Sequence, residues 1–551
     1  MGKMRTPLAP LAVIFSLFSC SADKEESAAA GLGGNAGTSG QTSAGAGPQG
    51  ATSSGGGKAA GNGGRSPTTG GTAGSNGKAG SGGKAGSGGK AGSSGGSANT
   101  SGAAGASEAG NSGSAADGGA GAAGSPGTAG DCDAPPSFDD GLSPDRELFV
   151  DAGAAGPGDG SAGAPFPTLD AALSEATAGT AIRLRPGIYD GGAFASDLHG
   201  TAVAPIWIGG ISGEARPVIS GGATALQLSR ASYVIVHDLE VSGQSDNGVN
   251  VDDGGDYDTE VTHHLTFRRL SIHDIGSGGN QDCLKLSGVY DYQVLESEFR
   301  GCSGGSAIDH VGCHRGLIAL NTFTELAGNA VQTKGGSDDI EITRNRFVNA
   351  GERSVNMGGS TDFEFFRPPL STVSNNYEAR DIRVVANTFR GSVSPIAFVG
   401  CVDCLLANNT IVDPTNWVLR ILQETTSEGA YAFLPAQNGR IVNNIFYFAR
   451  GDLSTYVNVG SDTSPDSFEL SHNLWYAHDD AGESEPSPLP APETDGLYGL
   501  DPAFAGPASD DYSIDSTSPA AGSGLALETP DADLEGSCYG QPPSRGAYEI
   551  H

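Results

Sequence analysis

Hydrophobic and polar residues alternate in short runs from about residue 145 to the end of the chain. Residues 339–347 (DIEITRNRF) are one example, in which Ile340 and Ile342 fall on the same face of an extended strand. The runs are separated by Gly, Asn and Asp residues, and no helical period intervenes between them. This pattern predicts many short strands joined by turns.

One residue pair recurs along this region: an Asn followed two residues later by a large apolar residue. Successive copies are 24, 42, 22, 35 and 29 residues apart, which fits a unit of about 22 to 24 residues with insertions. An Asn amide can bond to nearby backbone and stack on the Asn of the next unit. The recurrence predicts a β-solenoid with one coil per unit. The pairs are Asn321/Phe323, Asn345/Phe347, Asn387/Phe389, Asn409/Ile411, Asn444/Phe446 and Asn473/Trp475.

The first twenty residues differ from this pattern. Two basic residues precede an apolar stretch at residues 8–18 that is too short to span a bilayer but is typical of a signal peptide. Residues 17–20 (LFSC) resemble the lipobox of bacterial lipoproteins, which implies cleavage before Cys20 and lipid attachment to it. Ser21 after this Cys implies, by the same resemblance, an outer-membrane location. An ordinary cleaved signal peptide is the alternative.

Residues 21–131 consist mainly of Gly, Ser, Ala, Thr and Asn. Such a segment offers too little apolar surface to offset the entropy of ordering. We therefore expect a disordered tether, with a root-mean-square reach of about 60 Å.

Three segments that follow the tether resemble the beginning of secreted right-handed parallel β-helix proteins. They are ELFVD at 147–151, APFPTLDAAL at 164–173 and IRLRPGIY at 182–189. The resemblance implies an all-β chain with a right-handed parallel β-helix over residues 145–551, closed by C-terminal motifs at 501–504, 518–524 and 545–550. Polysaccharide lyases, hydrolases, epimerases and adhesins share this architecture, so it fixes no reaction. A short N-terminal capping helix would contain Leu169, Ala172, Leu173 and Ala176.

Aligning the coils by their alternation brings the middle residues of several apolar triplets into register. Each middle residue is expected to point outward, with successive coils about 4.8 Å apart. A polar row at this pitch suits an extended glycan, whereas a solvated strand face with weak ion pairs is the alternative. His310 points inward by the same alternation. The polar row consists of Asn250, Lys285, Asp309, Gln332, Asn356 and Arg420.

Lys285 and Asp309 are the candidate catalytic residues of the row. Lyases of the resembling group remove the proton next to a uronate carboxylate with a basic side chain, while a cation neutralises the carboxylate. The resemblance implies that Lys285 is the base, assisted by Arg420 or Lys334. A nearby Asp309 would raise the pKa of Lys285, which opposes this role. Asp309 and Asp282 offer an alternative, paired carboxylates for glycoside hydrolysis.

An acidic segment lies one coil before Lys285. Carboxylate oxygens close together are the ligands that Ca²⁺ prefers, so a calcium site is one interpretation. The spacing matches no EF-hand loop, and a solvated acidic loop is the alternative. The segment contains Asp246, Asn250, Asp252, Asp253, Asp256 and Asp258, of which Asp252, Asp253 and Asp256 are the candidate ligands.

The longest insertion between two aligned triplets lies between residues 356 and 397. It contains residues 363–369 (FEFFRPP), which are too apolar to be wholly exposed without a reason. An aromatic platform for sugar rings is one interpretation, and packing against the adjacent coil is the other. Residues 425–435 are expected to form the opposite wall. The candidate sugar contacts are Phe365, Phe366 and Arg367.

Eight Cys residues minus Cys20 leave seven, an odd number for an oxidising compartment. We expect one free thiol. A lone CxxC at 401–404 lacks the second pair that zinc requires. The candidate disulfides are Cys132–Cys538, which would join the ends of the solenoid, and one pair among Cys283, Cys302 and Cys313.

The chain carries 30 Lys and Arg against 64 Asp and Glu, a net charge of −34, which argues against a nucleic-acid partner. The charge also opposes an anionic substrate unless calcium or local basic residues reverse the field. The leading hypothesis is a monomeric lipoprotein, anchored in the outer membrane, that binds and cleaves an acidic polysaccharide by β-elimination. A noncatalytic glycan-binding or adhesion module and a polysaccharide hydrolase are the alternatives.

Overall fold

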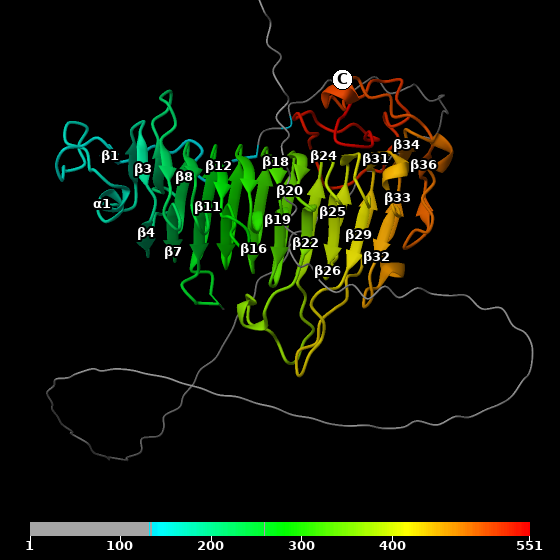
Figure 1. Cartoon of the computed structure of the whole chain (residues 1–551), viewed down its shortest axis with the longest axis horizontal. Coiled ribbons are helices and arrows are strands. Elements are labelled where there is room, and N and C mark those ends of the chain that lie inside the picture. The colour runs from blue at the N-terminus through cyan, green and yellow to red at the C-terminus, as the bar shows by residue number, and fades with distance from the viewer. Residues whose placement is uncertain (1–131, 133–134, 258, 551) are drawn as a thin grey trace, which may run out of the picture. The chain divides into compact units, whose positions relative to one another are not determined.

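The computed structural model describes residues 132, 135–257 and 259–550, all within one compact unit. Their strands stack into three parallel sheets of 14, 10 and 12 strands (Figure 1). The predicted parallel β-helix is therefore confirmed. The predicted signal peptide, Cys20 and the tether lie outside the described residues.

Each sheet is named here by its number of strands. The 14-stranded sheet contains β1 (Arg146–Val150), β2 (Thr180–Leu184), β5 (Ile206–Gly210), β8 (Ser232–His237), β11 (Thr262–Arg268), β14 (Val289–Leu295), β17 (His314–Ala319), β20 (Ser337–Thr343), β23 (Ala379–Val385), β26 (Cys401–Val402), β27 (Leu405–Ala407), β30 (Arg440–Val442), β33 (Glu469–Ser471) and β35 (Glu493–Thr494). The 10-stranded sheet contains β4 (Ala193–Ser196), β7 (Leu226–Ser229), β10 (Val249–Asp252), β13 (Leu284–Ser287), β16 (Ser306–Val311), β19 (Asn329–Lys334), β22 (Arg353–Gly358), β25 (Ile396–Val399), β29 (Leu419–Leu422) and β32 (Val457–Val459). The 12-stranded sheet contains β3 (Ile188–Asp190), β6 (Val218–Ser220), β9 (Glu240–Ser242), β12 (Ser271–Ile275), β15 (Glu298–Cys302), β18 (Thr322–Leu326), β21 (Arg346–Ala350), β24 (Thr388–Arg390), β28 (Thr410–Val412), β31 (Ile445–Phe448), β34 (Leu474–Ala477) and β36 (Leu497–Tyr498).

Helical segments are few and short. Among the described residues, no helix is both long and apolar enough to cross a membrane. The helices are α1 (Leu169–Leu173) and the 3₁₀ turns η1 (Phe363–Phe365), η2 (Arg450–Asp452), η3 (Pro465–Ser467), η4 (Ala481–Glu483) and η5 (Pro507–Ser509).

The alternation of the strands builds the core. In β13, Leu284 and Leu286 are buried, while Lys285 between them faces outward. Apolar side chains from successive coils stack along the solenoid axis because equivalent positions are in register. Four Phe rings make one such stack, with centroids of neighbouring rings 4.5 to 5.1 Å apart. They are Phe299, Phe323, Phe347 and Phe389.

The recurring Asn residues form a buried ladder, as predicted. The Nδ2 of each Asn donates to the Oδ1 of the next Asn at 2.9 to 3.0 Å. The ladder begins where Ser297 N donates to Asn321 Oδ1, and it ends where Glu493 Oε1 accepts from both N and Nδ2 of Asn473. These bonds satisfy amide groups that the turns would otherwise bury without partners.

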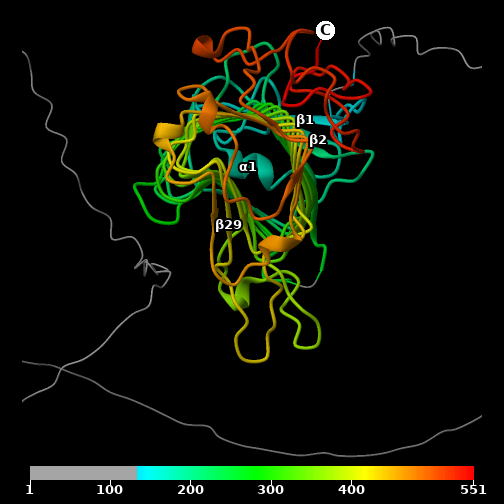
Figure 2. The ribbon, with the colours of Figure 1, turned by 90° about the vertical axis from the view of Figure 1, so that its right-hand side faces the viewer.

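Helix α1 closes the N-terminal end of the solenoid, as the end-on view shows (Figure 2). Thr168 caps it by accepting from Ala171 N at 3.3 Å, and its residues Leu169, Ala172 and Leu173 are buried. The predicted capping helix is thus confirmed, but it ends at Leu173, and Ala176 packs on the core beyond its end. The helix hides the apolar interior that the first coil would expose.

The C-terminal segment lies against the side of the solenoid. Phe504 and Tyr548 join Val412, Ile445 and Leu474 in an apolar cluster on the outer face of the 12-stranded sheet. The motifs predicted to close the solenoid therefore cover the flank of its last coils.

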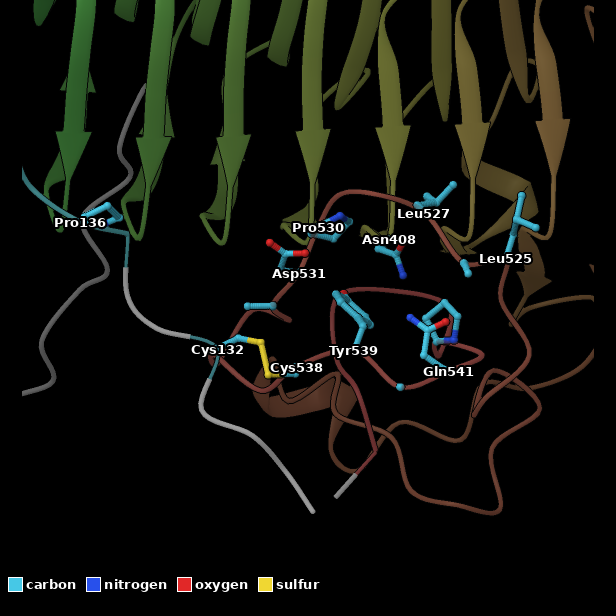
Figure 3. A pocket seen from close by; sticks show the side chains of 14 residues that line it. Cys132, Pro136, Asn408, Leu525, Leu527, Pro530, Asp531, Cys538, Tyr539 and Gln541 are labelled. Atoms are coloured by element: carbon cyan, nitrogen blue, oxygen red, sulfur yellow. A yellow bond between two sulfur atoms is a disulfide. The ribbon is translucent and has the colours of Figure 1, made fainter. Parts of the chain in front are cut away.

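A strap, residues 132 and 135–142, precedes β1 and crosses the outer face of the 14-stranded sheet. Cys132 forms the predicted disulfide with Cys538 (Figure 3). Gln293 Nε2 donates to the Pro136 carbonyl at 2.7 Å, and Phe138 packs against an apolar cluster on that face. Residues before the predicted boundary at 145 thus also pack on the solenoid. A pocket of about 500 Å³ lies beside the disulfide, but no predicted substrate, metal or catalytic residue lines it (Figure 3).

The remaining cysteines also agree with the sequence. Cys283 pairs with Cys302, which leaves Cys313 as the free thiol among the described residues. Burial raises the pKa of Cys313 to about 12, so it is no nucleophile at neutral pH. Cys401 and Cys404 are bonded to each other.

Candidate functional site

The predicted register of the 10-stranded sheet is confirmed. Asn250, Lys285 and Asp309 occupy equivalent positions on adjacent strands. We call the complete set of equivalent positions the outward row, because the residues on either side of its members are buried, apart from Val459 beside Asn458. The outward row contains Phe194, Gln227, Asn250, Lys285, Asp309, Gln332, Asn356, Ala397, Arg420 and Asn458.

A second row lies two positions further along each strand, nearer the edge where the strands end. Asp252 and Lys334 were each predicted as site residues, but their shared row was not predicted. Hydroxyl and charged groups dominate it, so the two rows together form a floor rich in hydrogen-bonding groups. The second row contains Ser196, Ser229, Asp252, Ser287, Val311 and Lys334.

Three insertions leave the solenoid at this edge, where the 10-stranded sheet connects to the 14-stranded sheet. The first insertion comprises the described residues 253–257 and 259–261, the second is residues 359–378 and the third is residues 423–439. The second and third project below the strands in Figures 1 and 2. The insertions are therefore placed to wall the floor formed by the two rows.

A pocket of about 530 Å³ lies between this floor and the insertions; we call it the groove pocket. Asn250, Lys285 and Lys334 contribute to its floor. Tyr257 of the first insertion and Phe365 of the second add aromatic surface. Tyr257 was not predicted, because a single Tyr in an acidic loop carries no pattern that marks it.

Two Lys ammonium groups converge on one buried carboxylate. Lys285 Nζ contacts Asp309 and lies 3.2 Å from Asp282 Oδ2, while Lys334 Nζ lies 3.4 Å from Asp309 Oδ1. Both Asp side chains are only 1% exposed, and the Lys side chains are 17% and 14% exposed. The Lys ammonium groups therefore lie between the carboxylates and the pocket.

Burial and charge set the protonation of this group. Burial raises the pKa of Asp282 to about 6, and the nearby Asp309 carboxylate adds to the effect. Burial would also raise the pKa of Asp309, but Lys285 and Lys334 outweigh it and lower that pKa. Burial alone would lower the pKa of Lys285, yet Asp309 and Asp282 raise it. Lys285 is therefore a stable cation in the unliganded protein, which opposes its predicted role as a base.

His310 points into the core, as predicted. It is fully buried, and its Nδ1 lies 2.8 Å from the Gln332 carbonyl. Burial lowers the pKa of His310 to about 4, so the imidazole is neutral near pH 7. It supports the strand below the Lys cluster and does not face the pocket.

Arg367 ties the second insertion to the first. Its Nε donates to Asp253 Oδ2 at 2.5 Å, its Nη2 donates to Oδ1 at 3.3 Å, and its guanidinium lies 4.1 Å from the Tyr257 ring centroid. The Arg and Asp side chains are 7% and 1% exposed. The chain passes close over Gly312, where an added Cβ would lie 2.3 Å from the Arg367 Cβ. Arg367 is thus an anchor for the pocket wall, and its charge is used within the protein.

The predicted calcium ligands are each held by protein groups. Asp253 pairs with Arg367, and Asp256 pairs with Arg230 at 3.1 Å. Asp252 Oδ1 accepts from Ser229 Oγ at 2.6 Å. Among residues 132, 135–257 and 259–550, no three metal-ligating side chains converge, and Asp258 lies outside these ranges. These residues do not fit a calcium ion as they stand, so calcium stays a prediction and no step below depends on it.

The aromatic insertion contributes less to the groove than predicted. Phe365 is 44% exposed and lines the pocket, but Phe366 is 2% exposed and packs against Phe433. Phe363 also contacts Phe433 and Tyr431. The second and third insertions therefore pack together and do not form opposite walls. Phe366 does not reach the groove because apolar burial against the neighbouring insertion is more favourable than exposure.

Glu378 joins these two insertions and was not predicted. Its Oε2 accepts from Gly335 N at 2.8 Å and from Thr361 Oγ1 at 2.9 Å, and its Oε1 accepts from Thr425 Oγ1. Burial raises its pKa. Only the fold brings these residues together, since they come from three separate turns.

The C-terminal half of the outward row is less open. Asn356 is 1% exposed, and its Oδ1 accepts from Arg353 Nη1 at 3.2 Å. Arg420 lies over the Trp417 ring, with 4.3 Å between its guanidinium carbon and the ring centroid. Five strand spacings separate Arg420 from Lys285, roughly 24 Å at about 4.8 Å each. At this separation Lys285 and Arg420 cannot contact the same sugar, so their predicted cooperation is wrong.

Comparisons with known proteins extend to the fold alone. No protein-family model matches the chain, and no curated protein matches it. Pectate lyase Pel9A is 16% identical, with a TM-score of 0.48 over 77% of this chain and 100% of that chain. A GH136 lacto-N-biosidase from Eubacterium ramulus is 15% identical, with a TM-score of 0.46 over 64% of this chain and 68% of that one. An alginate lyase from Paenibacillus sp. str. FPU-7 is 16% identical, with a TM-score of 0.39 over 57% and 97%.

Proposed function

We propose that this protein binds an acidic polysaccharide along the groove of the 10-stranded sheet. The observation that carries the proposal is the pair of ammonium groups, Lys285 and Lys334, on the floor of a pocket flanked by Tyr257 and Phe365. Aromatic side chains present apolar faces, which match the C–H faces of sugar rings. Amides such as Asn250 match sugar hydroxyls, and the ammonium groups match carboxylates.

The local charge of the floor differs from that of the whole chain. The net charge of the chain is −34, but the central group contains two Lys and two Asp residues. Because the pKa of Asp282 is raised to about 6, this group becomes net positive below that pH. Lys285 and Lys334 line the pocket, whereas Asp282 and Asp309 do not; the Asp252 carboxylate, which also lines it, accepts hydrogen bonds from Ser229 and Gln227.

We extend the proposal to cleavage by β-elimination, with Lys285 as the base. In this reaction a base takes the proton from the carbon next to the uronate carboxylate, the bond from the β-carbon to the glycosidic oxygen breaks, and an unsaturated uronate remains. Lys285 must first lose its own proton. Since Asp309 and Asp282 raise the pKa of Lys285, the rate should rise with pH through the alkaline range.

Absorbance of unsaturated uronate tests cleavage directly. The full chain is mixed with polygalacturonate, alginate and glycosaminoglycans over neutral to alkaline pH, with calcium and with chelator. Absorbance should rise on one polymer and should be lost in Lys285→Met. The matched control is Arg440→Met, because Arg440 forms an exposed ion pair with Glu469 on a different sheet. Flat traces on all polymers at every pH would refute cleavage by β-elimination.

A noncatalytic glycan-binding module is the second candidate. The raised pKa of Lys285 and the burial of Asp309 and Asp282 favour it, because a stable cation above shielded carboxylates binds anions without being a ready base. Retention on a polygalacturonate or alginate column without absorbance change would support this candidate. Hydrolysis by paired carboxylates fits less well, since neither Asp lines the pocket.

We also propose that the chain is lipid-anchored in the bacterial outer membrane through Cys20, as the lipobox resemblance implies. Labelling of growing cells with a palmitate analogue should mark the protein, and Cys20→Ala should abolish the label. Recovery of labelled Cys20→Ala protein would refute this proposal.

A further inference from the structure

Phe194 occupies an unusual place for an exposed aromatic residue. It lies on β4, the first strand of the 10-stranded sheet, and is 53% exposed. It is a member of the outward row, in register with Gln227, Asn250 and Lys285 on the next three strands. Three strand spacings correspond to roughly 14 Å from Phe194 to Lys285 at about 4.8 Å each.

The floor between Phe194 and the groove pocket is continuous and polar. Gln227 Nε2 donates to Asp252 Oδ2 at 3.2 Å, which leaves its second amide hydrogen and its carbonyl available on the half-buried side chain. Ser196 and Ser229 of the second row run beside it. A chain that leaves the pocket toward β4 therefore meets amides, hydroxyls and the Asp252 carboxylate that they bind, and then an aromatic ring.

Single exposed apolar residues are common on protein surfaces and need no function. Ile188 and Val203 are examples here, since they are 72% and 79% exposed and lie outside the 10-stranded sheet. Phe194 differs from them because its register position places it in line with the groove pocket.

We propose that Phe194 forms a distal sugar-binding subsite, at which the ring stacks on a sugar of the same glycan chain that occupies the groove pocket. This inference rests on the proposed function. It makes the site a path along the solenoid axis, so that a long polymer gains a contact that a short oligosaccharide bound in the pocket does not reach.

The test compares glycan length in the Phe194→Ala variant of the full chain. Affinities are measured by calorimetry for polygalacturonate and alginate polymers and for their trisaccharides. For the polymer that binds, Phe194→Ala should weaken affinity about tenfold, equivalent to about 1.4 kcal/mol, while affinity for the trisaccharide stays unchanged. Phe194→Trp should retain polymer affinity, and Ile188→Ala is the matched control, an exposed apolar residue truncated on another sheet.

The outcomes distinguish failure of the Phe194 subsite from failure of the proposed function. Equal polymer affinity of Phe194→Ala and the unaltered chain overturns the subsite and leaves the proposed function intact. Equal loss for trisaccharide and polymer also overturns it, since the effect then arises inside the pocket or from altered folding. If the unaltered chain binds neither polymer, both proposals fail.

Discussion

Removal of the Asp253 carboxylate should release the second insertion from the edge of the groove. In Asp253→Ala the Arg367 guanidinium loses both of its bonds to that carboxylate while it remains in a site where its side chain is 7% exposed. Removing one partner of a buried ion pair typically costs about 3 to 5 kcal/mol, because the other charge stays buried without compensation. The insertion can recover part of this cost by moving Arg367 into water.

Amide hydrogen exchange measures this release locally. The Arg367 amide donates to the Gly335 carbonyl at 3.0 Å, so its exchange reports opening of the insertion. A cost of about 3 to 5 kcal/mol corresponds to faster exchange by roughly two to four orders of magnitude. Affinity for the glycan should fall as well, because Phe365 on the same insertion loses its position.

Asp256→Ala is the matched control for this prediction. Asp256 pairs with Arg230, and their side chains are 40% and 37% exposed, so loss of that pair should cost about 1 kcal/mol or less. Similar exchange rates for the Arg367 amide in Asp253→Ala and Asp256→Ala would refute the assignment of Asp253 as an anchor. So would calcium-dependent protection of that amide that disappears in Asp253→Ala, because it would show that Asp253 binds calcium.

Three further predictions concern charge, the ladder and the aromatic wall. Affinity for polygalacturonate should fall as pH rises through about 6. Burial and Asp309 raise the pKa of Asp282 to about 6, and ionisation of Asp282 then adds negative charge to the floor. An affinity that calorimetry finds independent of pH across that range would contradict this prediction. Asn387→Ala should lower the free energy of unfolding in urea by about 1 to 3 kcal/mol, because it leaves buried ladder groups without partners. Asn375→Ala, at an exposed position with an ordinary backbone conformation, should change it little, and equal effects of the two variants would contradict the role of the ladder. Phe366→Ala should destabilise the protein by about 3 to 5 kcal/mol in the same assay, while Phe365→Ala should mainly weaken glycan affinity, and the reverse result would show that their roles are exchanged.

The fold could be predicted because its cause is periodic. Alternation of period two determines which side chains enter the core, and the repeated Asn marks where a coil turns. The outward position of Lys285 and the turn position of Asn345 could therefore be predicted from the sequence. The alternation runs through the strands of the whole solenoid, and the Asn repeat covers the coils from Asn321 to Asn473. The register of the outward row followed from them without any knowledge of tertiary contacts.

The site could be predicted only where it follows the same period. Insertions break the repeat, and their side chains are placed by contacts between segments far apart in the sequence. Arg367 reaches Asp253 across 114 residues, and Glu378 reaches Thr425 across 47. No sequence pattern indicates either pairing, so from the sequence alone Arg367 fitted a substrate contact as well as an internal ion pair.

The strap has a mechanical consequence. A solenoid under tension at one end opens coil by coil, since each coil contacts only its neighbours. Here a pull on the chain that precedes Cys132 passes through the disulfide to Cys538, and from there into the C-terminal segment packed on β28, β31 and β34. The load thus bypasses β1, and the first coils of the groove, including β4 and β7, are shielded from peeling for as long as that disulfide is oxidised.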